Sequence, residues 1–290
     1  MRYFLKLSYN GAPFHGWQIQ PNAVSVQQTV ENALATLLRV PTPITGAGRT
    51  DTGVNARVMF AHFDFDGVLP ERRRMLQALN RLCGPAIAFH DIFPMAPDAH
   101  ARFDATSRTY RYFVSHVKNP FLAGLIWHSP SQLDYGAMNN AAQILLETED
   151  FTSFAKLHSD VKTNICHVSE ALWQPVSIAF AQPDIYDIDD VDDVDVNFLD
   201  NGFPMLLESD MSGNGESVVT TCFTITADRF LRNMVRAIVG TLIDVGRGKL
   251  SIADFTDIIN CKDRCAAGTS MPPHALFLWD ITYPKDIFAS

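Results

Sequence analysis

Segments with the two-residue hydrophobic period of strands and segments with the 3.6-residue period of helices follow one another in irregular order along this chain of 290 residues. Alternating apolar or β-branched residues predict strands at Phe4–Tyr9, Val58–Phe65, Thr109–Val117, Ser217–Thr226 and Leu276–Tyr283. Helical spacing predicts helices at about Ser25–Leu38, Pro70–Leu82, Leu133–Glu147 and Asp228–Ile243, and from Ser251 onward. A parallel sheet would need strands and helices in regular alternation. The irregular order therefore predicts an α+β fold with a largely antiparallel sheet.

Composition excludes several classes of protein. Hydrophobic residues make up 47% of the chain, which is enough for a sizeable core and too much for a disordered protein. The chain has no run of ~18 uninterrupted apolar residues, so no membrane span is predicted. The first residues lack the apolar core of a signal peptide. Five cysteines without a Cys-x-x-Cys pair argue against a disulfide framework, so we expect a cytoplasmic protein. Cys261 and Cys265 could share a helical face, but no further ligands stand at zinc spacing.

The net charge of −9 conceals a strong segregation of charge. Residues 183–217 contain eleven acidic side chains and no Lys or Arg, and without them the rest of the chain would carry +2. We interpret residues 183–215 as an acidic insertion, either a solvated loop or an exposed hairpin, and like-charge repulsion favours the loop. Basic residues cluster at 72–74, 102–111 and 229–236. Because phosphates respond to the local field, a nucleic-acid partner is compatible with this composition.

The segment Gly46–Ala56 concentrates the residues most suited to chemistry. Its three glycines allow unusual backbone angles and the close approach of another chain, and Arg49 and Asp51 lie between them. A turn in which Asp51 bonds its own backbone would also explain this composition. No second carboxylate lies nearby in the sequence, so a paired-acid glycosidase site has no local support. The Gly-Lys-Ser/Thr ending of a phosphate-binding P-loop is absent, so no nucleotide cofactor is predicted.

Aromatic and basic side chains alternate on the strand predicted from Thr109. Tyr110 and Tyr112 would lie on one face, and Thr109 and Arg111 on the other. Aromatic rings beside arginines suit stacked bases and their phosphates. A core strand with buried tyrosines and solvated arginines fits the same pattern, so both interpretations stay open here.

A second cationic group is predicted at the helix that follows Asp228. If Asp228 caps this helix, Arg229, Arg232 and Arg236 stand at i, i+3 and i+7 and lie on one face. Three arginines in one row suggest a stripe that faces an anion. Solvated arginines beside an apolar stripe are the alternative.

Six motifs, taken in order, resemble those of the tRNA pseudouridine synthase A family over about Tyr3 to Pro284. They are Tyr9–Gln27, Gly48–Val54, His100–Phe103, Arg108–Tyr112, Asp150–Phe154 and Phe230–Arg236. The acidic insertion departs from the shorter family pattern and lies away from all six. The resemblance implies the pseudouridine synthase fold: two α+β lobes, residues 1–105 and 106–290, that share a continuous, mainly antiparallel mixed sheet flanked by helices, with a basic central cleft.

The same resemblance implies a reaction. The family isomerises uridine to pseudouridine at positions 38, 39 and 40 of the tRNA anticodon stem-loop, as a homodimer and without cofactor or metal. The reaction breaks the C1′–N1 bond and joins C1′ to C5, so it is redox-neutral. A carboxylate can act as the covalent nucleophile, on either the base or the sugar, so a single aspartate is enough.

Roles for individual residues follow from the resemblance. Asp51 would be the nucleophile, and Arg236 would pair with it and orient it. Tyr110 would stack on the uracil and assist proton removal at C5. Arg49 would fill or brace the gap left by a flipped-out base. The other substrate-binding candidates are Arg102, Arg108, Arg111 and Arg232.

Two functions of other classes compete with this hypothesis. A non-catalytic RNA-binding protein would keep the basic residues, but it has no need of Asp51 facing phosphates. A nucleoside hydrolase would also cleave a glycosidic bond, but the basic clusters favour a polynucleotide substrate. We expect the acidic insertion to point away from the RNA, because its charges would repel phosphates within a Debye length of ~8 Å.

Overall fold

The structure is a computed structural model, which describes residues 1–156, 163–178, 218–285 and 287–288. The described strands are β1 (Arg2–Tyr9), β2 (Thr45–Gly46), β3 (Asn55–Asp64), β4 (Ile87–Met95), β5 (Ser107–Ser115), β6 (Trp127–His128), β7 (Val168–Ile178), β8 (Val218–Ala227) and β9 (Leu276–Thr282). The described helices are α1 (Val26–Leu38), α2 (Arg72–Leu82), α3 (Tyr135–Glu147), α4 (Met234–Gly246) and α5 (Ile252–Cys261). The predicted acidic insertion, residues 183–215, lies outside the described residues.

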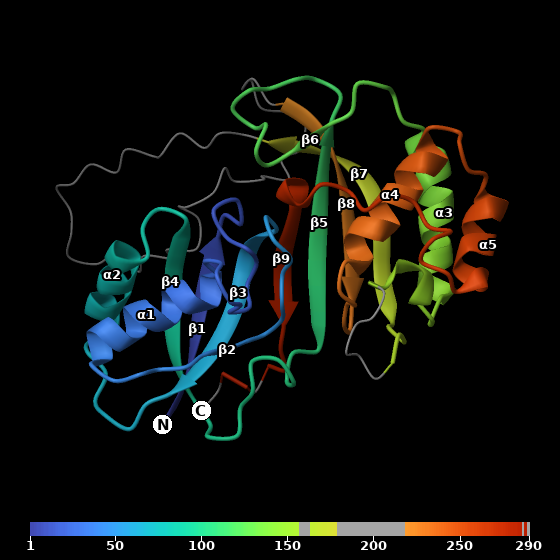
Figure 1. Cartoon of the computed structure of the whole chain (residues 1–290). Coiled ribbons are helices and arrows are strands. Elements are labelled where there is room, and N and C mark those ends of the chain that lie inside the picture. The colour runs from blue at the N-terminus through green and yellow to red at the C-terminus, as the bar shows by residue number, and fades with distance from the viewer. Residues whose placement is uncertain (157–162, 179–217, 286, 289–290) are drawn as a thin grey trace.

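One sheet runs through the whole molecule (Figure 1). Its strands follow the order β4-β1-β3-β9-β5-β8-β7, while β2 pairs with β3 and β6 with β5. Only the β3–β9 and β5–β6 pairs are parallel among the described strands. Helices α1 and α2 lie over the strands at one end, and α3 and α4 lie over those at the other (Figure 1). The predicted α+β class with a mainly antiparallel sheet is confirmed.

Side-chain caps fix two helix ends where the sequence predicts them. The Ser25 hydroxyl accepts the N–H of Gln28 at the start of α1. At α5, Ser251 and Asp254 form a complete capping box. Because α5 ends at Cys261, followed by Lys262 in the left-handed region, Cys265 lies beyond the helix. The two thiols therefore do not share the helical face that their spacing would allow.

Helix α4 begins five residues later than it would if Asp228 capped it. Asp228 does not cap it, because its Oδ1 accepts the N–H groups of His167 (2.8 Å) and Arg229 (2.7 Å). Asn233, in the left-handed region at φ 66°, precedes the first helical residue. Arg229 and Arg232 therefore stand on the connection before the helix, and the predicted row of three arginines on one helical face is wrong.

Four strands are missing from the sequence prediction, and the two long ones form the edges of the sheet. Both β4 and β7 contain a proline, Pro94 and Pro175, and β4 also carries a His-Asp pair that interrupts the apolar alternation. Proline removes a ladder donor, which an edge strand can tolerate. The pattern that marks an inner strand is thus absent from these two for a structural reason.

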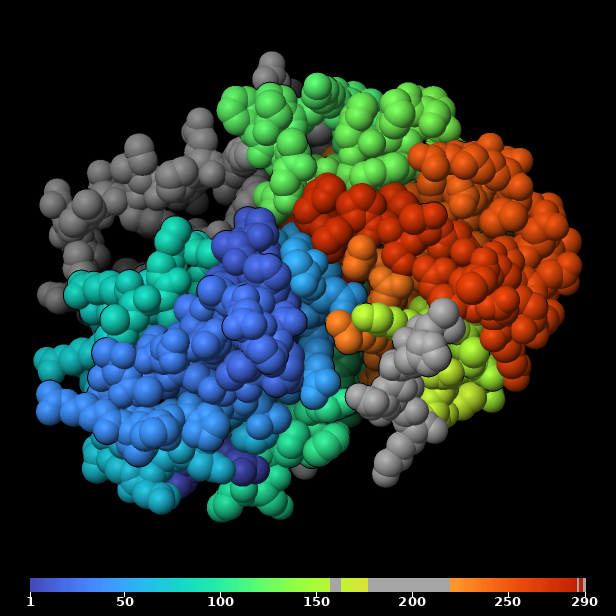
Figure 2. Space-filling model, viewed as in Figure 1, coloured from blue at the N-terminus to red at the C-terminus, as the bar shows by residue number. Residues whose placement is uncertain are grey.

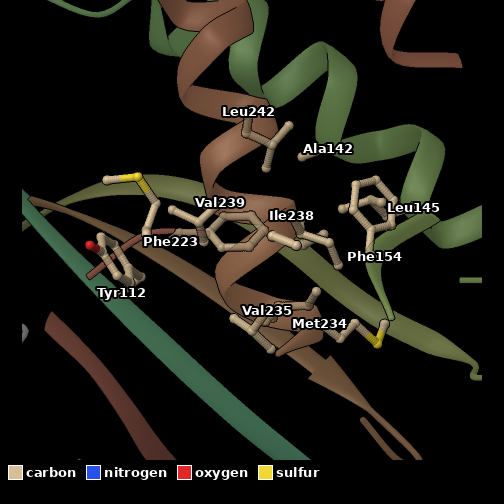
Figure 3. Packing of buried hydrophobic residues seen from close by; sticks show 14 of the residues in the cluster. Tyr112, Ala142, Leu145, Phe154, Phe223, Met234, Val235, Ile238, Val239 and Leu242 are labelled. Atoms are coloured by element: carbon tan, nitrogen blue, oxygen red, sulfur yellow. The ribbon is translucent and has the colours of Figure 1, made fainter. Parts of the chain in front are cut away.

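Two large hydrophobic clusters lie at the two ends of the sheet. In α4, eleven residues are buried, and Figure 3 shows Ile238, Val239 and Leu242 packed among Phe223 of β8 and Leu145 of α3. The other cluster joins α1 and α2 to the strands of the N-terminal end. Tyr110 packs against both clusters. The division into lobes at residues 105 and 106 stays a prediction.

Candidate active site

Asp51 lies on a tight turn just before β3, at the junction of the two clusters. The Asp51 carbonyl accepts the N–H of Val54 (3.1 Å), and Gly53 takes a positive φ of 75° within the turn. An L side chain rarely adopts this conformation, so glycine closes the turn here. The Asp51 carboxylate is 23% exposed, which leaves it partly shielded but reachable.

The segment before α1 holds the Asp51 turn through Thr50. The Thr50 carbonyl accepts the N–H of Trp17 (3.2 Å), and its hydroxyl bonds the buried Tyr9 hydroxyl (2.8 Å). Gly16 approaches so closely that a Cβ there would lie 2.6 Å from the Thr50 carbonyl oxygen. These contacts fix the backbone immediately before Asp51.

A second set of contacts ties the end of the turn to the C-terminal half of the chain. A Cβ on Gly11 would lie 2.2 Å from the Val54 carbonyl oxygen, so the two backbones touch. The Asn55 Oδ1 accepts the Gly11 N–H (2.8 Å), and its Nδ2 donates to the His274 carbonyl (2.7 Å). The turn therefore bridges both halves of the molecule.

Two guanidinium groups from the C-terminal half face the Asp51 carboxylate. Arg232 Nε lies 3.5 Å from Oδ1, and Arg236 Nη1 lies 3.7 Å from Oδ2. Arg236 is also held by a backbone contact, because its Nε donates to the Met271 carbonyl (2.6 Å). The exposed fractions differ, at 20% for Arg236 and 63% for Arg232. Arg236 is thus the anchored cation and Arg232 the solvent-facing one.

Tyr110 provides an aromatic surface beside this pair. Its ring packs edge-on against Phe230 at a centroid distance of 5.0 Å. Burial raises the pKa of the Tyr110 hydroxyl well above its ordinary value, and the Asp51 charge raises it further. The hydroxyl is therefore neutral near physiological pH.

The other predicted arginines occupy different environments. Arg49 and Arg102 are exposed. Arg108 is half-buried on the same face of β5 as Tyr110, and its guanidinium donates to backbone carbonyls. Arg111 points to the opposite face, where its guanidinium lies 4.5 Å from the Trp279 ring centroid. The structure thus brings Arg232 and Arg236 to Asp51, while Arg111 lies on the far side of the sheet.

Three residues without a predicted role also shape this site. Phe230 supports the Tyr110 ring, the Met271 carbonyl anchors Arg236, and Asn55 links the turn to His274. Phe230 and Asn55 lie in or beside quoted motifs, so their positions carried a signal. Met271 acts through its backbone, which no side-chain pattern reveals.

The chemical resources of the site are one carboxylate, two guanidiniums and a neutral phenol. Among the described residues, no group of three or more His, Cys, Asp or Glu side chains is placed to hold a metal ion. Likewise, no described helix is long and apolar enough to cross a membrane.

In Figure 2 the N-terminal residues, in blue, and the C-terminal residues, in orange to red, face each other across the middle of the molecule. A carboxylate so placed can serve as a nucleophile toward a substrate that lies between the two sides.

Comparison with known proteins gives consistent matches. Residues 141–284 match the model of a family described as tRNA pseudouridine synthase. The chain is 49% identical over 287 residues to tRNA pseudouridine synthase A of Parabacteroides distasonis, covering 99% of this chain and 98% of that protein. It is 47% identical over 287 residues to the protein of the same name from Bacteroides fragilis, with coverage of 99% and 98%. It is 34% identical over 281 residues to that from Geobacter sulfurreducens, with coverage of 96% and 98%.

Proposed function

This chain belongs to the tRNA pseudouridine synthase A family, and from that premise we propose where and how it acts on tRNA. It is an isomerase that converts uridine to pseudouridine in tRNA. We propose that its targets are positions 38, 39 and 40 of the anticodon stem-loop, and that Asp51 is the nucleophile. The target positions rest on the family resemblance. The observation that carries the nucleophile assignment is the Asp51 carboxylate between the Arg232 and Arg236 guanidiniums, at 3.5 and 3.7 Å.

The covalent step needs only the carboxylate. Asp51 attacks the target nucleotide, at C6 of the base or at C1′ of the sugar, and the C1′–N1 bond breaks. The uracil turns and C5 bonds to C1′. The carboxylate is released, C5 loses its proton, and N1 gains one. Atoms and electrons balance without an added reactant. Arg236, fixed by the Met271 carbonyl, orients the carboxylate during these steps.

Tyr110 contributes a stacking surface and a neutral hydroxyl. The raised pKa of that hydroxyl disfavours a phenolate that would act as a base by itself. We therefore assign Tyr110 to stacking on the uracil and to relaying the C5 proton through its hydroxyl. Its edge-on packing against Phe230 keeps the ring in place for both tasks.

A uridine inside a stem must leave the helix before Asp51 can reach it. Flipping a base costs a few kcal/mol, which contacts with the protein have to offset. Arg49 is exposed and precedes Asp51 by two residues, which supports its assignment to the space that the flipped base leaves. Arg232 and Arg102 are also exposed, and we assign them to the flanking phosphates.

The proposal is tested by tritium release from tRNA that carries 5-³H-uridine. Wild type should release tritium, while Asp51→Ala and Asp51→Asn should lose at least about a thousandfold in rate and still bind tRNA. Asp66→Asn, at an exposed position, is the matched control and should behave like wild type. Near-normal release by either Asp51 variant would overturn the nucleophile assignment. Binding without release by wild type would favour a non-catalytic RNA-binding protein, and turnover of free uridine would favour a nucleoside hydrolase.

Two further parts of the proposal rest on the family resemblance. We propose that the protein works as a homodimer in the cytoplasm. Light scattering on the purified chain should give twice the 32.3 kDa of one copy. A mass of one copy at working concentration would contradict the dimer.

A further inference from the structure

Within the described part of the chain, the Arg108 guanidinium makes four hydrogen bonds, and all four go to backbone carbonyls. Its Nη1 donates to the carbonyls of Ala105 (2.8 Å) and Asp228 (2.9 Å). Its Nη2 donates to those of Arg102 (2.5 Å) and Ala47 (3.2 Å). Each Nη carries two hydrogens, so these bonds use every Nη–H of the side chain.

The four carbonyls belong to three segments that are far apart in the sequence. Ala47 lies on the segment that leads to Asp51. Arg102 and Ala105 lie on the connection between β4 and β5. Asp228 directly follows β8 and opens the connection that carries Arg229, Phe230 and Arg232. One side chain therefore joins the segment that supplies the carboxylate to the segment that supplies one of its cations.

A phosphate ligand would have to present its donors to the RNA. Arg108 is only half-buried, but its Nη donors are already engaged with the protein. A phosphate could use the Nη donors only by breaking these contacts and leaving the carbonyls without that donor. The planar fork of arginine suits several carbonyls at once, whereas lysine offers a single ammonium on a flexible stem.

We propose that Arg108 is a positioning residue for the reaction, which holds the Asp51 segment and the Asp228–Arg232 connection in register, rather than a ligand of tRNA phosphates. This inference rests on the proposed function, in which Asp51 works beside Arg232 and Arg236. Arg108 acts through the backbone of both segments and does not itself touch the reacting atoms.

The test compares Arg108→Gln and Arg108→Lys with wild type. With tritium release at a temperature where each variant is folded, kcat should fall at least tenfold in both, with a smaller change in KM. Arg108→Lys should not rescue the rate, because one ammonium cannot bond four carbonyls. Arg2→Lys is the matched control, since Arg2 donates to the Ala99 carbonyl (2.9 Å) within the same connection but touches neither Ala47 nor Asp228. Its kcat should match that of wild type.

Salt dependence separates positioning from phosphate binding. The slope of log Kd against log salt for unmodified tRNA should be unchanged in Arg108→Gln, because no phosphate contact is lost. A slope reduced by about 0.7 to 0.9, with kcat intact and Arg108→Lys like wild type, would show a phosphate ligand and overturn the proposal. A lower Tm with unchanged kcat would show a merely structural role and also overturn it.

Hydrogen exchange tests the positioning role of Arg108 independently of whether the proposed reaction takes place. Amides at 45–54 and 228–233 should exchange faster in Arg108→Gln than in wild type or Arg2→Lys, whether or not tRNA is turned over. Unchanged exchange in both segments would overturn the positioning role. Absence of tritium release from wild type would contradict the proposed function alone.

Discussion

The two sides of the site are held by different physical means. The Asp51 turn depends on backbone contacts at glycines, such as Gly11 against Val54 and Gly16 against Thr50. Arg236 instead stands on α4, whose buried apolar residues anchor it in the C-terminal cluster. The turn is therefore sensitive to a single added carbon atom, whereas the helix is sensitive to lost buried volume. Atomic crowding controls one side and core packing the other.

The difference extends to the charges at the site. The carboxylate side has a fixed backbone and a single acid. The cationic side has one anchored guanidinium, Arg236, and one exposed guanidinium, Arg232. We therefore expect Arg236 to keep Asp51 oriented and Arg232 to contribute less to the reaction. Four predictions, ordered by expected effect, test this division.

The largest effect is expected from crowding the Asp51 turn. Gly11→Ala places a Cβ 2.2 Å from the Val54 carbonyl oxygen, so the backbone has to move. We expect a loss of at least about 4 kcal/mol in the free energy of unfolding, or a displaced turn with turnover reduced more than about a hundredfold. Urea unfolding and tritium release measure the two. Gly124→Ala, which meets open space, should match wild type in both; a wild-type-like Gly11→Ala would show that the turn relaxes easily.

The next effect is expected in the core beneath α4. Leu242 is fully buried, and Leu242→Ala should lower the free energy of unfolding by about 2–5 kcal/mol. Because the Asp51 turn is untouched, kcat measured on folded protein should stay within about twofold. Leu146→Ala, at a position that is 39% exposed, should cost less than about 1 kcal/mol. A fall in kcat that parallels the loss of stability would show that the core also sets the site geometry.

A smaller effect should separate the two cations. Arg236→Gln removes an anchored, largely shielded guanidinium and should lower kcat about a hundredfold, or about 3 kcal/mol. Arg232→Gln removes a solvent-screened one and should cost about 1 kcal/mol or less in activation free energy. Single-turnover kinetics at saturating enzyme measures both. Equal losses would mean that anchoring by the Met271 carbonyl has no effect on the reaction.

The smallest effect concerns pH and lies wholly on the N-terminal side. Burial, with smaller contributions from the charges of Arg2 and His100, lowers the pKa of His62 from its ordinary 6.5 to about 4. At a pH between these two values, His62 therefore binds a proton in the unfolded chain but not in the folded chain. Stability should fall by about 1–2 kcal/mol from this group as the pH drops from 6.5 to 5.

His62→Gln provides the control for this pH effect, because the glutamine side chain does not titrate. Urea unfolding at pH 6.5 and pH 5 should show a smaller fall for the variant than for wild type. The difference between the two falls isolates His62 from carboxylates such as Asp64, whose pKa is also lowered. Identical falls would show that His62 does not exclude the proton.

The sequence by itself determined the parts of this protein that depend on local rules. Ser25 and Ser251 mark helix starts because a hydroxyl satisfies the first free N–H groups. Alternation located the inner strands and placed Tyr110 and Arg111 on opposite faces. The glycine-rich segment around Asp51 was also recognisable, because its motif is contiguous.

Only the tertiary structure decided how distant segments meet. Asp228 bonds the His167 N–H across the β7–β8 pair, so α4 starts later and Arg232 reaches Asp51 from a connection instead of a helix. The carbonyls that accept hydrogen bonds from Arg108 are backbone groups, so no side-chain pattern in the sequence reveals them. Local rules concern neighbours along the chain, whereas these contacts depend on how the sheet brings remote backbones together.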